Sequence, residues 1–381
     1  MRMLRFLDGG ESHGKGLVAI LEGIPSNCEI NIEKINEELS RRQKGYGRGK
    51  RMAIESDKVE IWSGLRGNKT TGNPVTLVIY NKDYDNWKEF FKREPKEEEI
   101  IKNARPGHGD LVGFYKYRTG DIRDVIERTS ARETAIRTAV GAFCKQVLNN
   151  FNIEIRSKVK SIGEVYDIDC DLYKEEVWEK VLKSQVSIFD KHCENRAKEL
   201  IDRCKEEGNT IGGTIFVSIK GVPLGLGSYS QWDRKLDAII SKGIMSLQGI
   251  KSISFGRIND LSLLGKNFQD EIFYENGKII RDTNNAGGIE AGVSNGENIE
   301  FTALMKPIPS IKGGIRSVDL VNKFNVESRY ERSDVCAVVP AAVVIENICA
   351  FEILKEFLQK FGGDELEEIK SNLYRFLSTL Y

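Results

Sequence analysis

The chain has 381 residues, of which 40% are hydrophobic and 30% are charged, a balance typical of a globular protein with a large core. Because 57 lysines and arginines match 57 aspartates and glutamates, no bulk electrostatic affinity for nucleic acid or membrane is expected. No run of about 18 apolar residues is present, which argues against a membrane-spanning helix. The N-terminal apolar stretch is too short for the core of a signal peptide, so we expect none.

The cysteines and the even composition indicate one cytoplasmic domain. Seven cysteines form an odd set without a Cys-x-x-Cys pair, a pattern typical of reduced thiols and not of a disulfide framework or a zinc site. The composition shows no linker, low-complexity segment or internal repeat. We therefore expect residues 1–381 to form a single domain.

Strands are predicted where β-branched residues lie between Gly, Pro or Asn, and helices where apolar residues keep a helical period. Strands and helices come without strict β-α-β alternation, which favours an α+β fold over a doubly wound sheet. In chain order, the predicted elements are a helix over Ile32–Arg42, strands over Val59–Ser63 and Val75–Asn81, a helix over Ser130–Asn149, a strand over Ile153–Val165, helices over Trp178–Lys183 and Cys193–Glu207, a strand over Thr214–Ile219, a helix over Leu236–Leu247, a hairpin over Ile272–Ile280, a strand over Ile299–Met305 and a helix over Pro340–Phe361.

Local signals support several of these boundaries. Ser130 and Glu133 have the spacing of a capping box, in which each side chain accepts from the other residue's backbone N–H. Asn276-Gly277 supplies the positive φ values of a type I′ turn. Pro340 stands in the first turn of the last helix, and glycine follows its end.

Two of the three histidines lie between glycines. His13 stands in Gly9-Gly-Glu-Ser-His-Gly-Lys-Gly16, and His108 stands in Arg105-Pro-Gly-His-Gly-Asp110. Glycines allow a ligand to approach closely, and an imidazole exchanges a proton near neutral pH. We expect Asp110 to orient His108, although each loop could also be a solvent-exposed polar turn. His192, in a charged stretch, is expected to be solvated.

A basic loop, Arg41–Arg51, follows the first predicted helix. Its six cations among glycines suit a phosphorylated anion, since guanidinium groups bind phosphate through paired hydrogen bonds. The same loop could be an RNA-contacting arm or a solvated charged turn. Sequence alone therefore leaves its role open.

Three other segments could contact a ligand. Arg128-Thr-Ser130 reads as a helix start, which is a site for an anion or a flavin edge or a purely structural cap. The Gly-rich stretch 284–296 and Lys306–Ser310 expose backbone where a ring or phosphate could lie.

No dinucleotide-binding or P-loop motif occurs. The residues alone indicate an enzyme for an anionic, phosphorylated small molecule, with two histidines as acid or base.

Several motifs together resemble chorismate synthase, over about residues 5–363 and in the same order along the chain. Because so many separate signatures agree, the resemblance is highly specific. They are Gly10-Glu-Ser-His-Gly14, Arg41-Arg-Gln-Lys-Gly-Tyr-Gly-Arg-Gly49, Ser63-Gly64 with Thr70-Thr-Gly72, Arg105-Pro-Gly-His108, Ser130-Ala-Arg-Glu-Thr134, Asn285-Ala-Gly-Gly-Ile289, Lys306-Pro307 and Arg332-Ser-Asp334.

The resemblance implies conversion of 5-enolpyruvylshikimate 3-phosphate (EPSP) to chorismate and phosphate, in the pathway to aromatic amino acids. It implies a β-α-β sandwich, with a helical layer between antiparallel sheets, and a homotetramer. It also implies reduced FMN as cofactor without net redox change, NADPH as reductant, and no metal. Whether the chain reduces its own flavin or needs a separate flavin reductase stays open.

The resemblance also implies roles for single residues. His13 would protonate the leaving phosphate, His108 would manage the charge of the reduced flavin near N1, and Asp334 would assist hydrogen removal by way of flavin N5. Ser12 and Ser130 complete the catalytic set. Arg42 and Arg48 match positions assigned to NADPH, and they would also suit the substrate phosphate. The implied flavin contacts are Arg128, Thr129, Ser130, Gln248, Gly249, Ala291, Lys306, Pro307, Ile308, Pro309, Ser310 and Arg332.

One departure from the family pattern bears on the site. Ser333 stands where many members have histidine, so Asp334 lacks a neighbouring imidazole, and Arg332 is the nearest cation in sequence. We interpret this as a subtype that keeps the function. The alternatives are a flavin- or phosphate-binding protein with a different reaction and an RNA-binding module, which the zero net charge disfavours.

Overall fold

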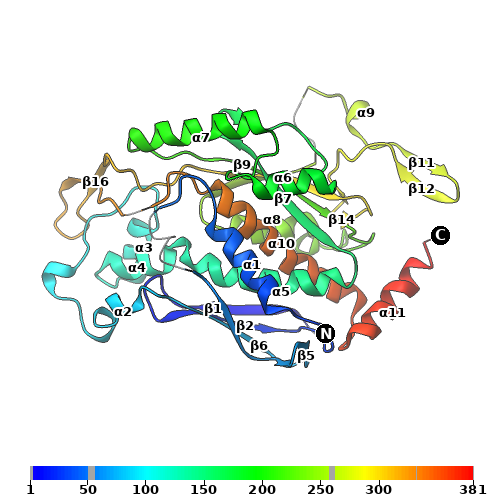
Figure 1. Cartoon of the computed structure of the whole chain (residues 1–381), viewed down its shortest axis with the longest axis horizontal. Coiled ribbons are helices and arrows are strands. Elements are labelled where there is room, and N and C mark those ends of the chain that lie inside the picture. Colours follow the sequence, from blue (N-terminus) through cyan, green and yellow to red (C-terminus); the bar gives the residue numbers. More distant parts are fainter. Residues whose placement is uncertain (1–2, 50–55, 257–261, 332, 381) are drawn as a thin grey trace.

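The computed structural model describes residues 3–49, 56–256, 262–331 and 333–380 (Figure 1). Of the helices in these ranges, none combines the length and apolarity that a membrane crossing requires. The principal helices are α1 (Ile32–Gln43), α2 (Tyr84–Trp87), α3 (Asp110–Tyr117), α4 (Ile122–Thr129), α5 (Thr134–Asn149), α6 (Glu175–Lys183), α7 (Lys191–Glu206), α8 (Leu236–Met245), α9 (Gly265–Phe268), α10 (Val338–Phe361) and α11 (Leu366–Leu377).

Two antiparallel sheets contain most of the strand residues. The first has the order β1-β2-β6-β3 and the second the order β10-β15-β9-β7-β8. Among the described residues, four two-stranded pairs complete the strands, and one of them, β11–β12, projects from the body (Figure 1). The strands are β1 (Arg5–Gly9), β2 (Gly16–Glu22), β3 (Val59–Ser63), β4 (Leu65–Arg66), β5 (Lys69–Thr70), β6 (Val75–Tyr80), β7 (Glu154–Ile162), β8 (Val165–Tyr166), β9 (Gly213–Lys220), β10 (Ile250–Phe255), β11 (Ile272–Glu275), β12 (Lys278–Arg281), β13 (Ile289–Glu290), β14 (Val293–Ser294), β15 (Ile299–Met305), β16 (Arg316–Val318) and β17 (Asn325–Glu327).

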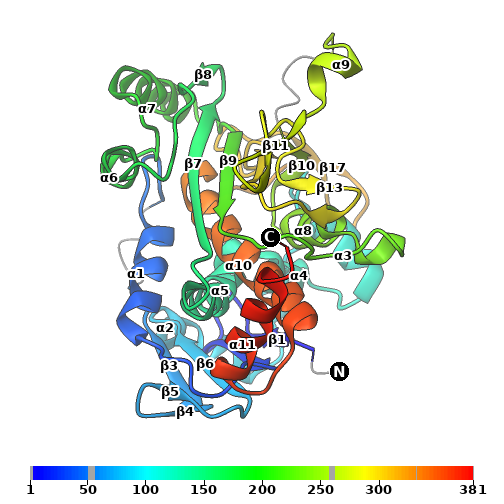
Figure 2. The same cartoon turned by 90° about the vertical axis from the view of Figure 1, so that its right-hand side faces the viewer.

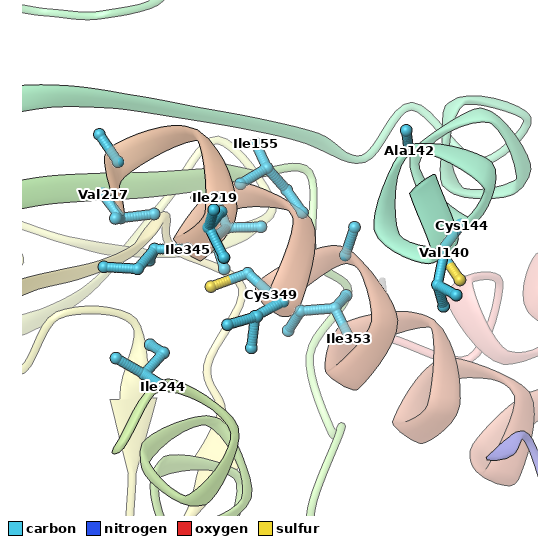
Figure 3. Packing of buried hydrophobic residues seen from close by; sticks show 14 of the residues in the cluster. Val140, Ala142, Cys144, Ile155, Val217, Ile219, Ile244, Ile345, Cys349 and Ile353 are labelled. Atoms are coloured by element: carbon cyan, nitrogen blue, oxygen red, sulfur yellow. The ribbon is translucent and has the colours of Figure 1, made fainter. Parts of the chain in front are cut away.

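Helices α5 and α10 pack against each other and carry the main hydrophobic core. Helix α5 contacts β2, β6 and β7, and α10 contacts β7, β9 and α8. Both helices are buried along almost their whole length, which is why their sequences are apolar on every side. Figure 2 looks along α5, and Figure 3 shows Ile345, Cys349 and Ile353 of α10 beside Ile155 of β7 and Ile219 of β9.

The structure confirms the α+β class and all the predicted helices to within a few residues. The strand expected over Ile153–Val165 is divided, because Gly163 has a φ of 51° and turns the chain so that β8 pairs back on β7. The sequence reading missed β1, β2, β10, α3, α4 and α11. Among the predicted strands, β3 and β15 have the expected bounds.

The predicted capping box is wrong. The Ser130 hydroxyl accepts from the N–H of Arg132 at 3.3 Å, while the Glu133 carboxylate accepts from Gln248 Nε2 at 3.1 Å. A 3-10 turn, Ala131–Glu133, precedes α5, and its tighter winding brings a different N–H to the cap. The type I′ hairpin is confirmed, since Asn276 and Gly277 have φ values of 52° and 83°.

Helices α5 and α10 approach each other closely at Gly141. A Cβ atom at this position would lie 2.1 Å from the carbonyl oxygen of Asn347 on α10. We predict that Gly141→Ala lowers the free energy of unfolding by at least about 1–3 kcal/mol, because the two helices must separate to admit the methyl group. Urea unfolding followed by circular dichroism measures this change.

Gly265→Ala in α9 is the matched control, since no atom lies within 4 Å of its added Cβ and alanine favours a helix. If Gly141→Ala unfolds at the same urea concentration as the control, the close packing of α5 against α10 is contradicted.

Candidate active site

A cavity of about 550 Å³ lies where α5 and α10 begin. The β10 and β15 ends and the segment after β15 complete its wall. Arg128 and Ala291 do not line it, and Arg332 lies outside the described residues. The predicted site residues found in the wall are Ser12, His13, Arg42, Arg48, His108, Thr129, Ser130, Gln248, Gly249, Lys306, Pro307, Ile308, Pro309, Ser310 and Asp334.

The loop that carries His13 connects β1 to β2 and is not a solvent-exposed turn. Asn81, just after β6, donates to the carbonyls of Glu11 and Gly14 at 3.1 and 2.7 Å and holds the loop closed. Ser12 is 2% exposed, and its hydroxyl donates to Ser130 Oγ at 3.1 Å. The two predicted hydroxyls therefore meet at the wall beside His13.

His108 faces the cavity through a loop that ends at α3. Its Nε2 lies 3.3 Å from Ser310 Oγ. Burial, together with the positive charges of Arg105 and Lys306, lowers the pKa of His108 to about 4. The expected orienting role of Asp110 is wrong, because this carboxylate accepts from Arg105 Nε and Nη2 at 2.8 and 2.9 Å. A guanidinium outcompetes an imidazole for the carboxylate because it offers two parallel donors.

Arg42 and Arg132 share one buried carboxylate. Asp57 accepts from Arg132 Nη1 at 2.6 Å and lies 3.4 Å from Arg42 Nη1. Arg42 also donates to Thr134 and to the Ala131 carbonyl. Burial, with repulsion from Arg132, lowers the pKa of Arg42 to about 10 despite the opposing effect of Asp57. The described part of the basic loop is therefore built into the wall and is not a solvated turn.

Arg48 pairs with Asp334, the carboxylate for which Arg332 was the nearest cation in sequence. Arg48 Nη1 donates to Asp334 Oδ2, and the N–H of Gly49 donates to Asp334 Oδ1 at 2.7 Å. Burial lowers the pKa of Arg48, and Asp334 opposes this change. Ser333 contacts the Ser310 carbonyl and its own neighbour's carbonyl, so the hydroxyl takes no part in this pair.

The expected helix start at Arg128-Thr-Ser130 is misplaced. Arg128 and Thr129 end α4, and only Ser130 caps the turn that leads into α5. Arg128 points away from the cavity and donates to Asp8 Oδ2 at 2.8 Å. Helix α5 still directs its N-terminal end toward the cavity, where the helix dipole favours an anion.

Positive charge exceeds negative charge around the cavity. Among the described residues, seven cations line it, and five carboxylates line it or pair with these cations. The excess of two cations favours a multiply charged anion such as a phosphate ester. The cations are Arg42, Arg48, Arg105, Arg123, Arg132, Lys251 and Lys306, and the carboxylates are Asp57, Asp110, Glu127, Glu331 and Asp334.

Known proteins match the chain over its full length. The family profile of chorismate synthase matches residues 4–358. The chain is 59% identical to a chorismate synthase of Clostridium tetani, covering 100% of this chain and 98% of that protein. The chain belongs to the chorismate synthase family.

Other relatives agree with this assignment. A chorismate synthase of Alkaliphilus oremlandii is 51% identical over 99% of both chains. A crystal structure of chorismate synthase has a TM-score of 0.80 and 37% identity, covering 100% of this chain and 99% of that chain. The chain is thus a shikimate-pathway lyase that converts EPSP to chorismate and phosphate, and its family requires reduced flavin.

Sequence reasoning missed several residues of the wall and its support. Arg105 and Arg132 lie in the motifs Arg105–Asp110 and Ser130–Thr134. The predictions from these motifs concerned only His108 and the helix cap. Glu127 directly precedes Arg128, and its contact with His13 Nδ1 at 2.8 Å depends on the approach of two distant segments. Asp57 and Trp87, whose indole stacks on His13, carry no local signal, because only the fold brings them to the site.

The low pKa of His108 predicts a pH-dependent contribution to stability. Its folded pKa of about 4 lies below the ordinary value of 6.5, so the unfolded chain binds a proton more readily between these values. The stability that neutral His108 contributes is present above pH 6.5 and is lost as the pH falls toward 4. We predict that, between pH 6.5 and pH 4, the free energy of unfolding of His108→Gln falls less than that of the wild type.

Urea unfolding at a series of pH values measures the effect. His192→Gln, which removes an exposed imidazole, is the control and should keep the wild-type slope. A His108→Gln slope equal to that of the control would show that His108 is not buried in its neutral form.

Proposed function

We propose that the cavity at the start of α5 and α10 binds EPSP together with reduced FMN, and that the elimination takes place there. The cation excess supports binding of the substrate, which carries a phosphate and two carboxylates. The apolar part of the wall, with Leu247, Ala337 and Val344, supports binding of a flat ring. The combination of cationic and apolar residues in the wall of one cavity carries the proposal.

Polar groups in the wall support the presence of a cofactor with both donors and acceptors. Arg48 Nε and Gln248 Oε1 are buried without a hydrogen-bond partner among the described residues, which is costly unless a ligand pairs with them. Gly107 and Gly249 have positive φ values, and a Cβ on Gly249 would lie 2.9 Å from Met305 Cε. These groups fit FMN, whose ring has donors and acceptors along one edge.

The residues of this chain would bind, orient and exchange protons around the reacting atoms. Reduced FMN, when bound, supplies electron density as the C–O bond to phosphate breaks and recovers it as the hydrogen leaves. Arg42, Arg48 and Arg132 would neutralise the charge that grows on the phosphate. His13 would donate a proton to it. Asp334 would hold the proton lost from the substrate, and neutral His108 would contact the flavin with Ser310.

Three wider assignments belong to the same proposal. NADPH would provide the reducing equivalents, used by the chain itself or through a separate flavin reductase. Helix α5 contacts strands of both sheets, and α10 contacts β7 and β9 and packs Phe351 against Phe6 of β1. The two helices would form the middle layer of a single-domain β-α-β sandwich. The chain would act as a cytoplasmic homotetramer, and the exposed apolar residues Ile272, Tyr274 and Ile279 of the projecting hairpin would offer a surface to another subunit.

We predict that His13→Ala lowers kcat by about 10²- to 10⁴-fold, the effect of removing a positioned general acid. The assay is anaerobic, uses chemically reduced FMN and follows chorismate absorbance, so that flavin reduction does not limit the rate. His192→Ala is the control and should turn over at the wild-type rate. Wild-type turnover of His13→Ala would remove this histidine from the reaction.

We predict that Asp334→Asn still binds FMN and EPSP but turns over at least about tenfold more slowly, because the amide keeps the shape and cannot hold a proton. Restoring the common histidine with Ser333→His should give little gain, since Arg48 already pairs with Asp334. Single-turnover kinetics with pre-reduced FMN measure both variants. A normal rate in Asp334→Asn would show that Asp334 is structural.

A further inference from the structure

His13 is held at one ring nitrogen by a buried carboxylate that none of the motifs contains. Glu127, on α4, accepts from His13 Nδ1 at 2.8 Å through Oε1 and lies 3.1 Å from the same nitrogen through Oε2. Its Oε2 also accepts from the backbone N–H of His13 at 2.8 Å. The Glu127 side chain is 3% exposed, so water does not compete for these contacts.

We propose that Glu127 is the positioning residue of His13: it holds the proton of Nδ1 and leaves Nε2 as the nitrogen that exchanges a proton with the substrate phosphate. This inference rests on the proposed role of His13 as the acid of the reaction.

The other ring nitrogen is free for this exchange. His13 lines the cavity, and the structure gives Nε2 no hydrogen bond to any residue that it describes. When Nε2 gives its proton to a phosphate oxygen, the N–H bond breaks, an O–H bond forms, and the ring becomes neutral with its remaining proton on Nδ1. A carboxylate that accepts from Nδ1 favours this tautomer.

Glu127 is itself kept in the ionised form. Burial alone would raise the pKa of Glu127, but the hydrogen bonds from His13 and the charge of Arg123 outweigh it and lower the pKa. Arg123 Nη1 lies 3.5 Å from Glu127 Oε1 on the same helix. The carboxylate therefore contacts both a cation and the imidazole.

Trp87 fixes the face of the same ring. Its indole stacks on His13 with ring centroids 4.2 Å apart and an interplanar angle of 29°, and the Arg123 guanidinium lies 5.1 Å from the indole centroid. Trp87 and Glu127 thus restrict the imidazole in two directions. A group that only filled space would not need the paired contacts from Glu127 to the ring and to the backbone N–H of the same residue.

The tautomer of His13 is the direct test, because it is read on the enzyme without substrate. The chain has three histidines, so ¹⁵N-histidine labelling gives a spectrum that variants at the other two positions assign. At a pH where the ring is neutral, we expect the His13 proton on Nδ1 in the wild type and loss of this preference in Glu127→Met. A proton on Nε2 in the wild type, or an unchanged preference in Glu127→Met, would overturn the inference.

Kinetics with reduced FMN give the second readout. We expect Glu127→Met to lower kcat by about 10- to 100-fold with KM changed less than about threefold, and Glu127→Gln, which keeps one acceptor, to lose less. Glu99→Gln, which breaks an exposed ion pair with Arg93, is the matched control with wild-type turnover. Wild-type kcat in Glu127→Gln would overturn the inference even if Glu127→Met does not fold.

The proposed roles of His13 and Glu127 can be tested separately. If His13→Ala keeps wild-type turnover, the proposed acid is wrong whatever Glu127 does. If His13→Ala is inactive while Glu127 variants keep both the tautomer and kcat, His13 acts without Glu127.

Discussion

Asp57 bridges Arg42 at the end of α1 and Arg132 at the start of α5, and the cationic wall of the cavity depends on this bridge. The Asp57 side chain has no exposed surface, and Asn81 accepts from Arg132 Nε at 2.8 Å. A single carboxylate thus holds two guanidinium groups that would otherwise repel each other. Removing one partner from such a buried group costs about 3–5 kcal/mol, so the arrangement is held by the fold and does not assemble only when substrate arrives.

The same crowding of positive charge accounts for the acid–base properties of the site. Burial and neighbouring cations lower the pKa of Arg42, His108 and Lys306 alike. The charges of Arg42 and Lys306 are therefore not fully compensated by the carboxylates of the protein, and His108 stays neutral. On the proposed function, a phosphate ester would supply the missing negative charge, and the interaction would strengthen as charge develops on the departing phosphate. The site would then stabilise the leaving group more than the bound substrate.

The sequence supports the prediction of local structure better than that of the contacts at the site. The start and end of helix α10 followed from Pro340 and from the glycines after Phe361, and the hairpin followed from Asn276-Gly277, because each signal lies within a few residues. Strand β2 was missed because its exposed residues Val18 and Ile20 are apolar like its buried ones, so the sequence shows no polar alternation.

Contacts between distant segments could not be predicted in this way. The sequence placed Asp110 beside His108 and Arg332 beside Asp334, since neighbours in sequence were the only candidates. In the structure Asp110 pairs with Arg105, and Asp334 pairs with Arg48, which is 286 positions away in the sequence. Family resemblance identified the reaction, and most of the site residues that it implied line the cavity. It gave no information on Glu127, whose place is fixed by the packing of α4 against the β1–β2 loop.

The most direct test of the account compares EPSP with its dephosphorylated analogue, 5-enolpyruvylshikimate, as ligands of the enzyme with oxidised FMN. Calorimetric titration, with the flavin absorbance as a second signal, gives both dissociation constants. The cation excess predicts that EPSP binds at least about tenfold more tightly, since a charge-assisted phosphate contact contributes about 1.5–3 kcal/mol, and that added salt reduces the difference. Equal affinities for the two ligands would contradict the assignment of the cationic wall to the substrate phosphate.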